Sequence, residues 1–396
     1  MDLAIRARRL ITPIEDLSDV VVGVEGGIVR SIEPFHEGRK AQFDRFIDAG
    51  DGVVVPGFVD LQVNGALGHN VRTAADDKRR EIYRHFLQHG TTTLVPTVVT
   101  DAHDALVRAL SVLAEDVGLD EAGLPAIPGI HLEGPFLNPE RRGAHPAEHL
   151  RSPDAALARA LWDAAGGRIA IVTLSPELPG ALPVVEWFAR QGVVVAAGHT
   201  TASCDVLFAA WERGLSMITH MGNVSDWPHR RLNAAGIMAS EPGAVGAFMI
   251  GDRLRASLIL DGYHFHPQLA GPLVRLRGPE HVALISDASY ATGCPPGQYD
   301  DGVIPTTVHP DGYAFATGGG GWLAGSIIML ERAVQVAVEL GQIPLREAIE
   351  MATLTPARIL GIDARKGCIA VGSDADLAVL DSRLAVARVF RAGHEV

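Results

Sequence analysis

The sequence predicts an α/β protein: a (β/α)8 TIM-type barrel with a small β-sandwich domain formed from both termini. Three observations support this fold class. Apolar strand candidates alternate with helical patterns through the middle of the chain, both ends contain short strand patterns, and polar residues directly follow the central strands. Parallel barrel strands bring their C-terminal ends to one face, where catalytic side chains lie. We therefore expect a functional site at that face.

The two ends of the chain contain the β-sandwich candidates. Residues 1–51 contain strand patterns at 3–7, 20–25 and 28–32, with Gly26 and Gly27 as a hairpin turn between the last two. Residues 361–396 contain further patterns at 367–369, 376–380 and 386–392. Chain termini often lie close together in compact proteins, so we expect both parts to form one domain.

Residues 52–360 contain the predicted metal-dependent catalytic barrel. Helices are expected at 77–89 and 101–114, where apolar residues recur at helical spacing, and two late helices, 326–340 and 344–360, complete the barrel. A doubly wound sheet is the alternative, but no GxGxxG motif follows the first strand. The eight strand candidates are residues 53–61, 92–99, 127–132, 169–174, 193–197, 217–219, 256–260 and 282–286.

The composition of the chain indicates which classes of binding partner are excluded and which cellular compartment is expected. The chain of 396 residues has 34 basic and 47 acidic residues and a net charge of −13, which argues against nucleic acid or an anionic membrane as partner. Its three cysteines form no CxxC pair, which favours a reducing compartment. With no signal-peptide pattern and no transmembrane-length apolar run, we expect a cytoplasmic protein.

Three metal-ligand residue types follow three different strand candidates. Glu133 comes after strand three, His199 after strand five and His220 after strand six. A single histidine at such a place is more often an ordinary loop residue, but one carboxylate and two imidazoles together favour a divalent metal site with an open position. Zinc, iron and cobalt all suit these ligands. Such an ion makes water nucleophilic near neutral pH.

Two further residues have possible catalytic roles. Asp287 ends strand eight, where a carboxylate can take a proton from water and pass it to a leaving amine, although aspartate is also common as a helix cap or turn residue. His145, in the loop after strand three, could polarise a carbonyl or could simply be an exposed loop residue. Gln62 and Asn64 end strand one, and because amides are poor zinc ligands, one metal is favoured over two.

The loop after strand six contains two arginines that could bind an anion. Arg230 or Arg231, together with His264, could hold a phosphate or carboxylate, or both arginines could be solvated surface residues. The residue pattern does not choose between these two interpretations, nor between the two arginines.

Short motifs recur over nearly the whole chain. One of them is HLEGPF at residues 131–136. The others are residues 56–65, 90–93, 143–145, 198–200, 219–220, 261–264, 286–288, 323–326, 352–358 and 372–377. With these motifs the chain resembles the amidohydrolase superfamily and, within it, the N-acetylglucosamine-6-phosphate deacetylase family, to which HLEGPF is most particular.

The resemblance implies a reaction and a set of residues. It implies hydrolysis of the acetamide of N-acetylglucosamine 6-phosphate to glucosamine 6-phosphate and acetate, by a homodimer with one divalent metal, zinc first, per subunit. Glu133, His199 and His220 would hold the metal, Asp287 would be the acid/base, and His145 would hold the amide carbonyl. The implied substrate-binding residues are Ala144, His145, Asn223, Arg230, Asp261, His264, Leu323, Ala324 and Gly325.

One segment departs from the family pattern. After the metal histidine the deacetylases usually read Leu-Phe/Tyr-Asn-Ala-Met, whereas here Met221, Gly222, Asn223 and Val224 follow His220. The family's phosphate-binding arginine falls near Arg230. The altered loop allows a second interpretation, an amidohydrolase acting on a different, unphosphorylated N-acyl substrate. A third, a catalytically silent scaffold, is disfavoured because Glu133, His199, His220 and Asp287 are all present.

Overall fold

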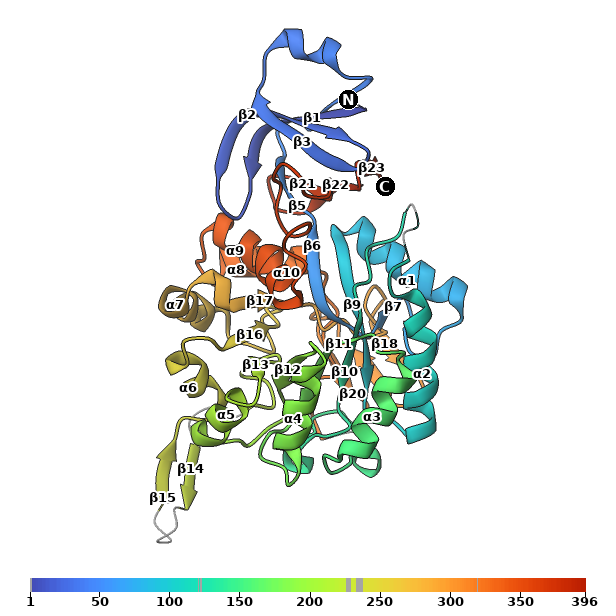
Figure 1. The fold of residues 1–396 in the computed structure, drawn as a ribbon, viewed down its shortest axis with the longest axis vertical. Helices are drawn as coiled ribbons and strands as arrows, with labels where there is room; N and C mark the ends of the chain where they lie inside the picture. The colour runs from blue at the N-terminus through green and yellow to red at the C-terminus, as the bar shows by residue number, and fades with distance from the viewer. Residues whose placement is uncertain (1, 120, 122, 226–228, 233–237, 319) are drawn as a thin grey trace.

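Two sheets organise the chain, one at the termini and one forming a barrel (Figure 1). The structure, a computed structural model, describes residues 2–119, 121, 123–225, 229–232, 238–318 and 320–396. The terminal sheet lies at the top of Figure 1 and the barrel below it, with both chain ends close together in the upper part. The predicted fold class is confirmed.

The barrel sheet runs through eight parallel strands in the described part of the chain. Their spatial order follows their sequence order, and apolar side chains fill the space between strands and helices. The strands are β6 (Phe58–Val63), β9 (Thr91–Val99), β10 (Ile130–Glu133), β11 (Ile169–Leu174), β12 (Val194–Ala197), β13 (Leu215–Ile218), β16 (Arg255–Leu258) and β17 (Val282–Leu284).

The barrel closes between its first strand and the segment after its last. Val63 forms a parallel bridge with Ala288, and the Asn64 amide donates to the Ala288 carbonyl over 2.9 Å. The Ser286 amide also donates to Oδ1 of the buried Asp60 over 3.2 Å. These contacts bring the end of β6 beside Asp287.

Helices surround the barrel, and most of them bury one apolar face, whereas α6 is buried along six consecutive residues, 243–248. In α1, for example, Ile82, Phe86 and Leu87 are buried, as their helical spacing predicts, and in α3 the Asp154 side chain caps the first turn. The helices are α1 (Asp76–Gln88), α2 (His103–Asp116), α3 (Ala155–Ala164), α4 (Ala181–Arg190), α5 (Cys204–Trp211), α6 (Gly243–Ile250), α7 (Pro267–Arg277), α8 (Leu330–Glu339), α9 (Leu345–Ala352) and α10 (Leu354–Leu360). No helix among the described residues is both long and apolar enough to cross a membrane.

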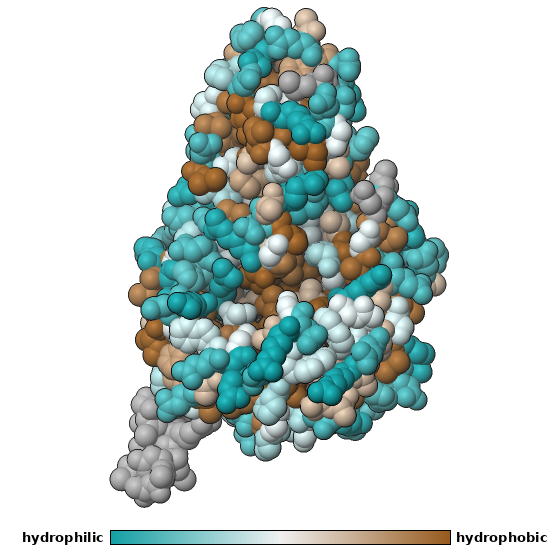
Figure 2. Space-filling view, in the orientation of Figure 1, coloured by the Kyte–Doolittle hydropathy of each residue, from teal (hydrophilic) through white to brown (hydrophobic). Residues whose placement is uncertain are grey.

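The terminal sheet combines strands from both ends of the chain around its own apolar cluster. Gly26 and Gly27 form the predicted hairpin turn, and on the face drawn in Figure 2 apolar side chains gather where this sheet meets the barrel. The strands are β1 (Leu3–Ile11), β2 (Asp16–Glu25), β3 (Ile28–Pro34), β4 (Arg45–Asp48), β5 (Val53–Pro56), β21 (Leu377–Leu380), β22 (Val386–Arg391) and β23 (His394–Glu395). The division of the chain at residues 51 and 360 stays a prediction.

The predicted first barrel strand, residues 53–61, is two strands. Residues 53–56 form β5 of the terminal sheet, and the barrel begins with β6 after Gly57. Gly57 is required here because a Cβ would lie 2.2 Å from the Thr92 hydroxyl oxygen. A continuous apolar run cannot reveal this change of sheet, since both halves are buried.

The late helices also differ from the prediction. Helix α8 begins only at Leu330, because Ser326 bridges to Ala288 and continues the barrel end. The helix predicted over 344–360 breaks at Thr353, so that Pro356 lies in the first turn of α10, where its missing N–H is tolerated. The segment 367–369 is not a strand, although Ile369 is buried against the terminal sheet.

Two small sheets extend from the barrel loops, and the sequence patterns predicted neither. The flap consists of β18 (Gly297–Tyr299), β19 (Thr306–Val308) and β20 (Ala314–Ala316). A hairpin of β14 (His229–Leu232) and β15 (Met238–Glu241), predicted as a loop, projects from the body at the lower left of Figure 1. A third pair, β7 (Gly65–Ala66) and β8 (His69–Asn70), follows the first barrel strand.

Candidate active site

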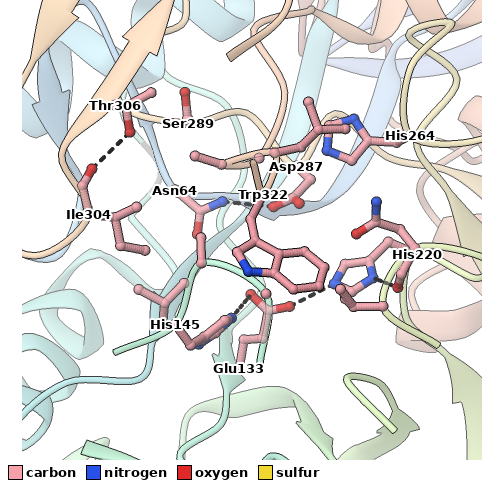
Figure 3. Close-up of a pocket in the computed structure, with 18 of the residues that line it drawn as sticks. Asn64, Glu133, His145, His220, His264, Asp287, Ser289, Ile304, Thr306 and Trp322 are labelled. Atoms are coloured by element: carbon pink, nitrogen blue, oxygen red, sulfur yellow. Dashed lines mark hydrogen bonds and ion pairs between the residues drawn. The ribbon is translucent and has the colours of Figure 1, made fainter. Parts of the chain in front are cut away.

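A cavity of about 270 Å³ lies at the C-terminal ends of the barrel strands. Glu133, His145, His199, His220 and Asp287 all line it, so the side chains predicted to form the centre of the site are brought together. They come from loops and strand ends that lie far apart in the sequence, from Glu133 to Asp287. Figure 3 shows most of them pointing into the same space.

Glu133 lies at the centre of this group. Its Oε1 is 2.9 Å from Nε2 of His220 and 3.3 Å from Nε2 of His199. The ring centroids of His199 and His220 are 5.0 Å apart, edge to face. All three side chains are buried. One carboxylate oxygen therefore faces two imidazole nitrogens in a site shielded from bulk water.

The opposite nitrogen of each imidazole fixes its tautomer. Nδ1 of His199 is 2.9 Å from the Arg141 carbonyl oxygen, and Nδ1 of His220 is 3.2 Å from the Asn223 carbonyl oxygen. A carbonyl only accepts, so each Nδ1 carries a proton, and in the neutral imidazole each Nε2 turns a lone pair toward Glu133. Lone pairs of two nitrogens and an oxygen facing one another are stabilised by a proton or a cation between them. This donor set fits a divalent metal.

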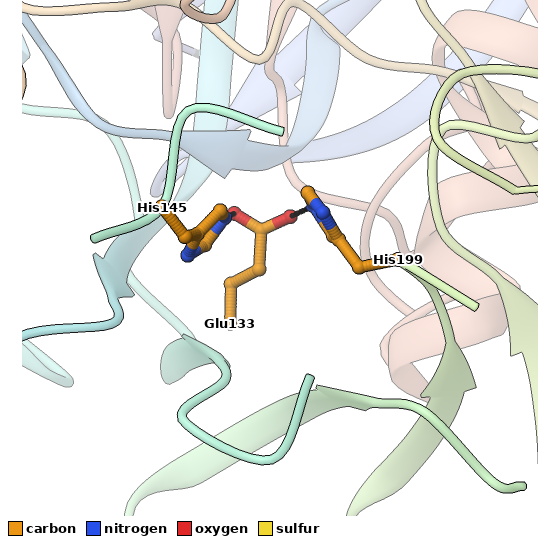
Figure 4. Close-up of side chains that lie close together, drawn as sticks. All are labelled: Glu133, His145 and His199. Atoms are coloured by element: carbon orange, nitrogen blue, oxygen red, sulfur yellow. Dashed lines mark hydrogen bonds and ion pairs between the residues drawn. The ribbon is translucent and has the colours of Figure 1, made fainter. Parts of the chain in front are cut away.

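His145 is the third histidine next to Glu133 and lies on the other side of the carboxylate from His199. Donor atoms of Glu133, His145 and His199 lie within 4.8 Å of one another, and Figure 4 shows the carboxylate between the two rings. The Nε2 of His145 is 3.8 Å from Oε2 of Glu133. Its Nδ1 is 2.9 Å from the Thr100 hydroxyl, which can donate or accept, so the tautomer of His145 is not fixed in the same way.

The electrostatics of the cluster follow from burial and mutual charge. Burial opposes ionisation of Glu133. When Nε2 of His199 and of His220 also carries a proton, hydrogen bonds from these nitrogens outweigh burial and hold the pKa of Glu133 well below its usual range. Burial also opposes a charge on His220, and Glu133 reverses this and raises the pKa of His220. For His145, burial and the nearby His199 lower the pKa to about 3, so His145 is neutral.

Asp287 lines the same cavity, but its pKa is shifted in the opposite direction from that of Glu133. Burial, followed by the negative charge of Glu133, raises the pKa of Asp287 to about 8. The side-chain amide of Asn64 donates to Oδ1 of Asp287 over 2.8 Å, which holds the carboxyl group in place (Figure 3). A carboxyl group whose pKa lies near neutrality can both accept and return a proton.

Three of these residues have a left-handed backbone. His199, His220 and Asp287 have φ of 50°, 30° and 47°. For a residue with a Cβ this conformation costs roughly 1–3 kcal/mol and is maintained only where the surrounding structure enforces it. It turns the three side chains sharply away from their strands and into the cavity.

Most, but not all, of the expected substrate-binding residues line the cavity. Asp261 is not among the lining residues but lies behind His264, with its Oδ2 2.6 Å from Nδ1 of His264. Arg230 belongs to β14, and its side chain lies outside the described residues. The expected residues that line the cavity are Ala144, His145, Asn223, His264, Leu323, Ala324 and Gly325.

His131, next to the metal-ligand candidates in sequence, has a structural role. Its Nδ1 is 3.2 Å from the Leu61 carbonyl oxygen and its Nε2 is 2.8 Å from the Thr173 hydroxyl. Burial lowers the pKa of His131 to about 4, so it is neutral. Its two ring nitrogens connect β10 to β6 and to β11 across the inside of the barrel.

Comparison with known proteins places this geometry in a family. The amidohydrolase family model matches residues 53–229 and 300–396. The chain belongs to the amidohydrolase family. N-acetylglucosamine-6-phosphate deacetylase of Danio rerio is 33% identical over 89% of this chain and 86% of its own. N-acetylgalactosamine-6-phosphate deacetylase of Escherichia coli O157:H7 is 32% identical over 99% of both chains.

A solved structure of a related amidohydrolase has the same fold over its full length. N-acetyl-D-glucosamine-6-phosphate deacetylase of Mycobacterium smegmatis has a TM-score of 0.88 and 35% identity, covering 100% of both chains. An aspartate-to-alanine variant of that enzyme was solved in complex with N-acetyl-D-glucosamine-6-phosphate.

Sequence reasoning missed several residues of this amidohydrolase pocket. Asn64 was considered only as a non-ligand, yet it holds Asp287. Asp301 and Trp322 line the cavity from the segment that contains the flap. The glycines and aspartates around them predict only turns, and the flap folds over the site through contacts far apart in sequence. Trp322, directly after a run of glycines, was the one available signal.

Proposed function

We propose that this amidohydrolase hydrolyses the acetamide of an N-acetylated amino-sugar 6-phosphate, with N-acetylglucosamine 6-phosphate as substrate and glucosamine 6-phosphate and acetate as products. The observation that supports this most is the buried cluster of Glu133, His199 and His220 beside Asp287. The names of the relatives support the choice of a sugar phosphate. The proposal includes a homodimer in the cytoplasm.

Glu133, His199 and His220 are the residues that we propose to hold one divalent cation, with zinc first and iron or cobalt as alternatives. The fixed tautomers of the two histidines support this choice over a set that includes His145. When bound, the cation would polarise an acyl oxygen and make water nucleophilic near neutral pH.

Asp287 is the proposed acid/base. Asn64 occupies its Oδ1, so Oδ2 is the atom left to take a proton from the attacking water and return it to the departing amine. His145 is the proposed donor to the acetamide oxygen. If the Thr100 hydroxyl donates to Nδ1, then Nε2 carries the proton and faces the pocket.

The sugar phosphate would occupy the rest of the cavity. His264, held by Asp261, and Asn223 offer polar groups, and residues 323–325 form an apolar wall. We assign the phosphate to Arg230 of β14, following the family pattern. Possible substrates also differ in the configuration of the hydroxyl group at carbon 4 of the sugar. A relative that aligns with 99% of this chain is named for the galactosamine epimer.

A substrate comparison with metal analysis tests the function. We expect purified protein to contain about one divalent ion per chain and to hydrolyse N-acetylglucosamine 6-phosphate with a kcat/KM about 100-fold above that for the unphosphorylated sugar, because a charge-assisted contact is lost. The galactosamine epimer is the third substrate. Equal rates with and without phosphate would contradict the proposed substrate and favour a plain N-acyl compound.

Two histidine variants test the ligand set. His220→Ala should lose the metal and the activity together, whereas His145→Ala should keep the metal and lose turnover. The opposite pattern, with the metal lost only in His145→Ala, would assign the ion to Glu133, His145 and His199 instead.

A further inference from the structure

Trp322 presents a large aromatic side chain to the cavity. It follows β20, and its carbonyl oxygen accepts from the Ala316 amide over 2.9 Å, while Leu323 forms an antiparallel bridge with Phe315. The backbone at residues 322–323 therefore continues the flap sheet. In Figure 3 the indole lies across the pocket in front of Glu133 and Asp287.

Packing within the fold does not explain this position. Trp322 is 38% exposed, although an indole normally contributes most when it is buried. Among the described residues no hydrogen-bond acceptor is found for its indole N–H, which buried tryptophans usually satisfy. An exposed aromatic face and an N–H donor without an acceptor, at the wall of a cavity, are typical of a ligand contact.

The flap, which Trp322 directly follows, is anchored to the barrel. Asn70 donates to Oδ2 of Asp301 over 3.0 Å, and Arg72 donates to the same oxygen over 3.3 Å. Oδ1 of Asp301 accepts from the amides of Val303 and Ile304. The side chains of Arg72 and Asp301 are almost fully buried. This anchor gives the flap, and with it the indole, a fixed place over the cavity.

We propose that Trp322 determines specificity for a pyranose ring: the indole packs against the C–H face of the sugar while its N–H is available to a sugar or phosphate oxygen. The inference rests on the proposed function and adds the surface on which the ring lies. A ring stacked on an indole buries apolar C–H groups and leaves its hydroxyls to His264 and Asn223 across the pocket.

Steady-state kinetics with N-acetylglucosamine 6-phosphate test this contact. Trp322→Ala should raise KM about tenfold and change kcat by less than about threefold, since stacking contributes to binding in the ground state and transition state alike. Trp322→Phe should restore most of the affinity and Trp322→Leu should not. Trp162→Phe, on α3 and packed against Trp187, is the matched control with unchanged constants.

Tryptophan fluorescence gives a second readout. Binding of glucosamine 6-phosphate should change the emission of the wild type and of Trp162→Phe, and the change should be absent in Trp322→Phe although the chain retains four other tryptophans. An unchanged KM in Trp322→Ala, with the emission change retained in Trp322→Phe, would overturn the inference while normal wild-type turnover leaves the proposed function intact. A wild type that neither binds nor hydrolyses the sugar phosphate would overturn both.

Discussion

Replacement of Asp287 by asparagine tests the proposed proton transfers without changing the arrangement of the site. The carboxyl group is buried at the cavity and accepts a hydrogen bond from Asn64 at Oδ1 over 2.8 Å. An asparagine oxygen can accept the same bond, so Asp287→Asn should keep its place. Only the ability to take and return a proton is removed.

The expected loss of activity follows from the two roles of this carboxyl group. General acid–base catalysis contributes about 10²–10⁴-fold, and Asp287 is assigned both proton transfers, so we expect kcat to fall by about 10³-fold or more. The metal content should remain at the wild-type level, because Glu133, His199 and His220 are untouched. KM should change little.

Stability gives an independent expectation for the same variant. Burial raises the pKa of Asp287 to about 8, so the native protein holds a proton that the unfolded chain has already lost, and wild-type stability falls as the pH rises toward that value. Metal-free Asp287→Asn lacks this penalty. It should therefore unfold at a higher temperature than the metal-free wild type at alkaline pH.

The assay combines acetate release, metal analysis and thermal unfolding of wild type and variant. Asp363→Asn, at an exposed position, is the control and should match the wild type in all three. Turnover by Asp287→Asn within about tenfold of the wild type, with full metal content, would refute the acid/base assignment.

The remaining predictions concern buried charges that support the site. Burial raises the pKa of Asp60 from an ordinary 3.8 to about 7, so wild-type stability should fall by about 3 kcal/mol more than that of Asp60→Asn between about pH 5 and pH 8. Urea unfolding at both pH values measures this, and parallel losses would refute it. Arg72→Met removes the partner of two buried carboxylates, Asp101 and Asp301, and should cost about 3 kcal/mol of unfolding free energy and raise KM by loosening the flap. Unchanged unfolding and KM would contradict the anchor.

Much of the fold could be predicted because its signals are local. The eight apolar strand candidates, the helical spacing in α1 and α2 and the Gly26–Gly27 turn depend on short stretches of sequence. The errors arose where tertiary contacts decide. Pro56 and Gly57 mark the passage from one sheet to another. The break at Thr353 places Pro356 in the first turn of α10, and apolar spacing alone does not reveal it.

The order of polar residues after apolar strands determined which side chains would meet at the barrel mouth, because parallel strands carry their C-terminal ends to one face. The tertiary structure decided how they meet. The left-handed backbone at His199, His220 and Asp287, the carbonyl groups that set two imidazole tautomers, and the flap that brings Trp322 over the cavity all depend on neighbours distant in sequence. The position of a polar residue after an apolar strand tells at which end of the barrel it lies. Only packing across the barrel fixes the orientation of an imidazole ring or the pKa of a buried carboxyl group.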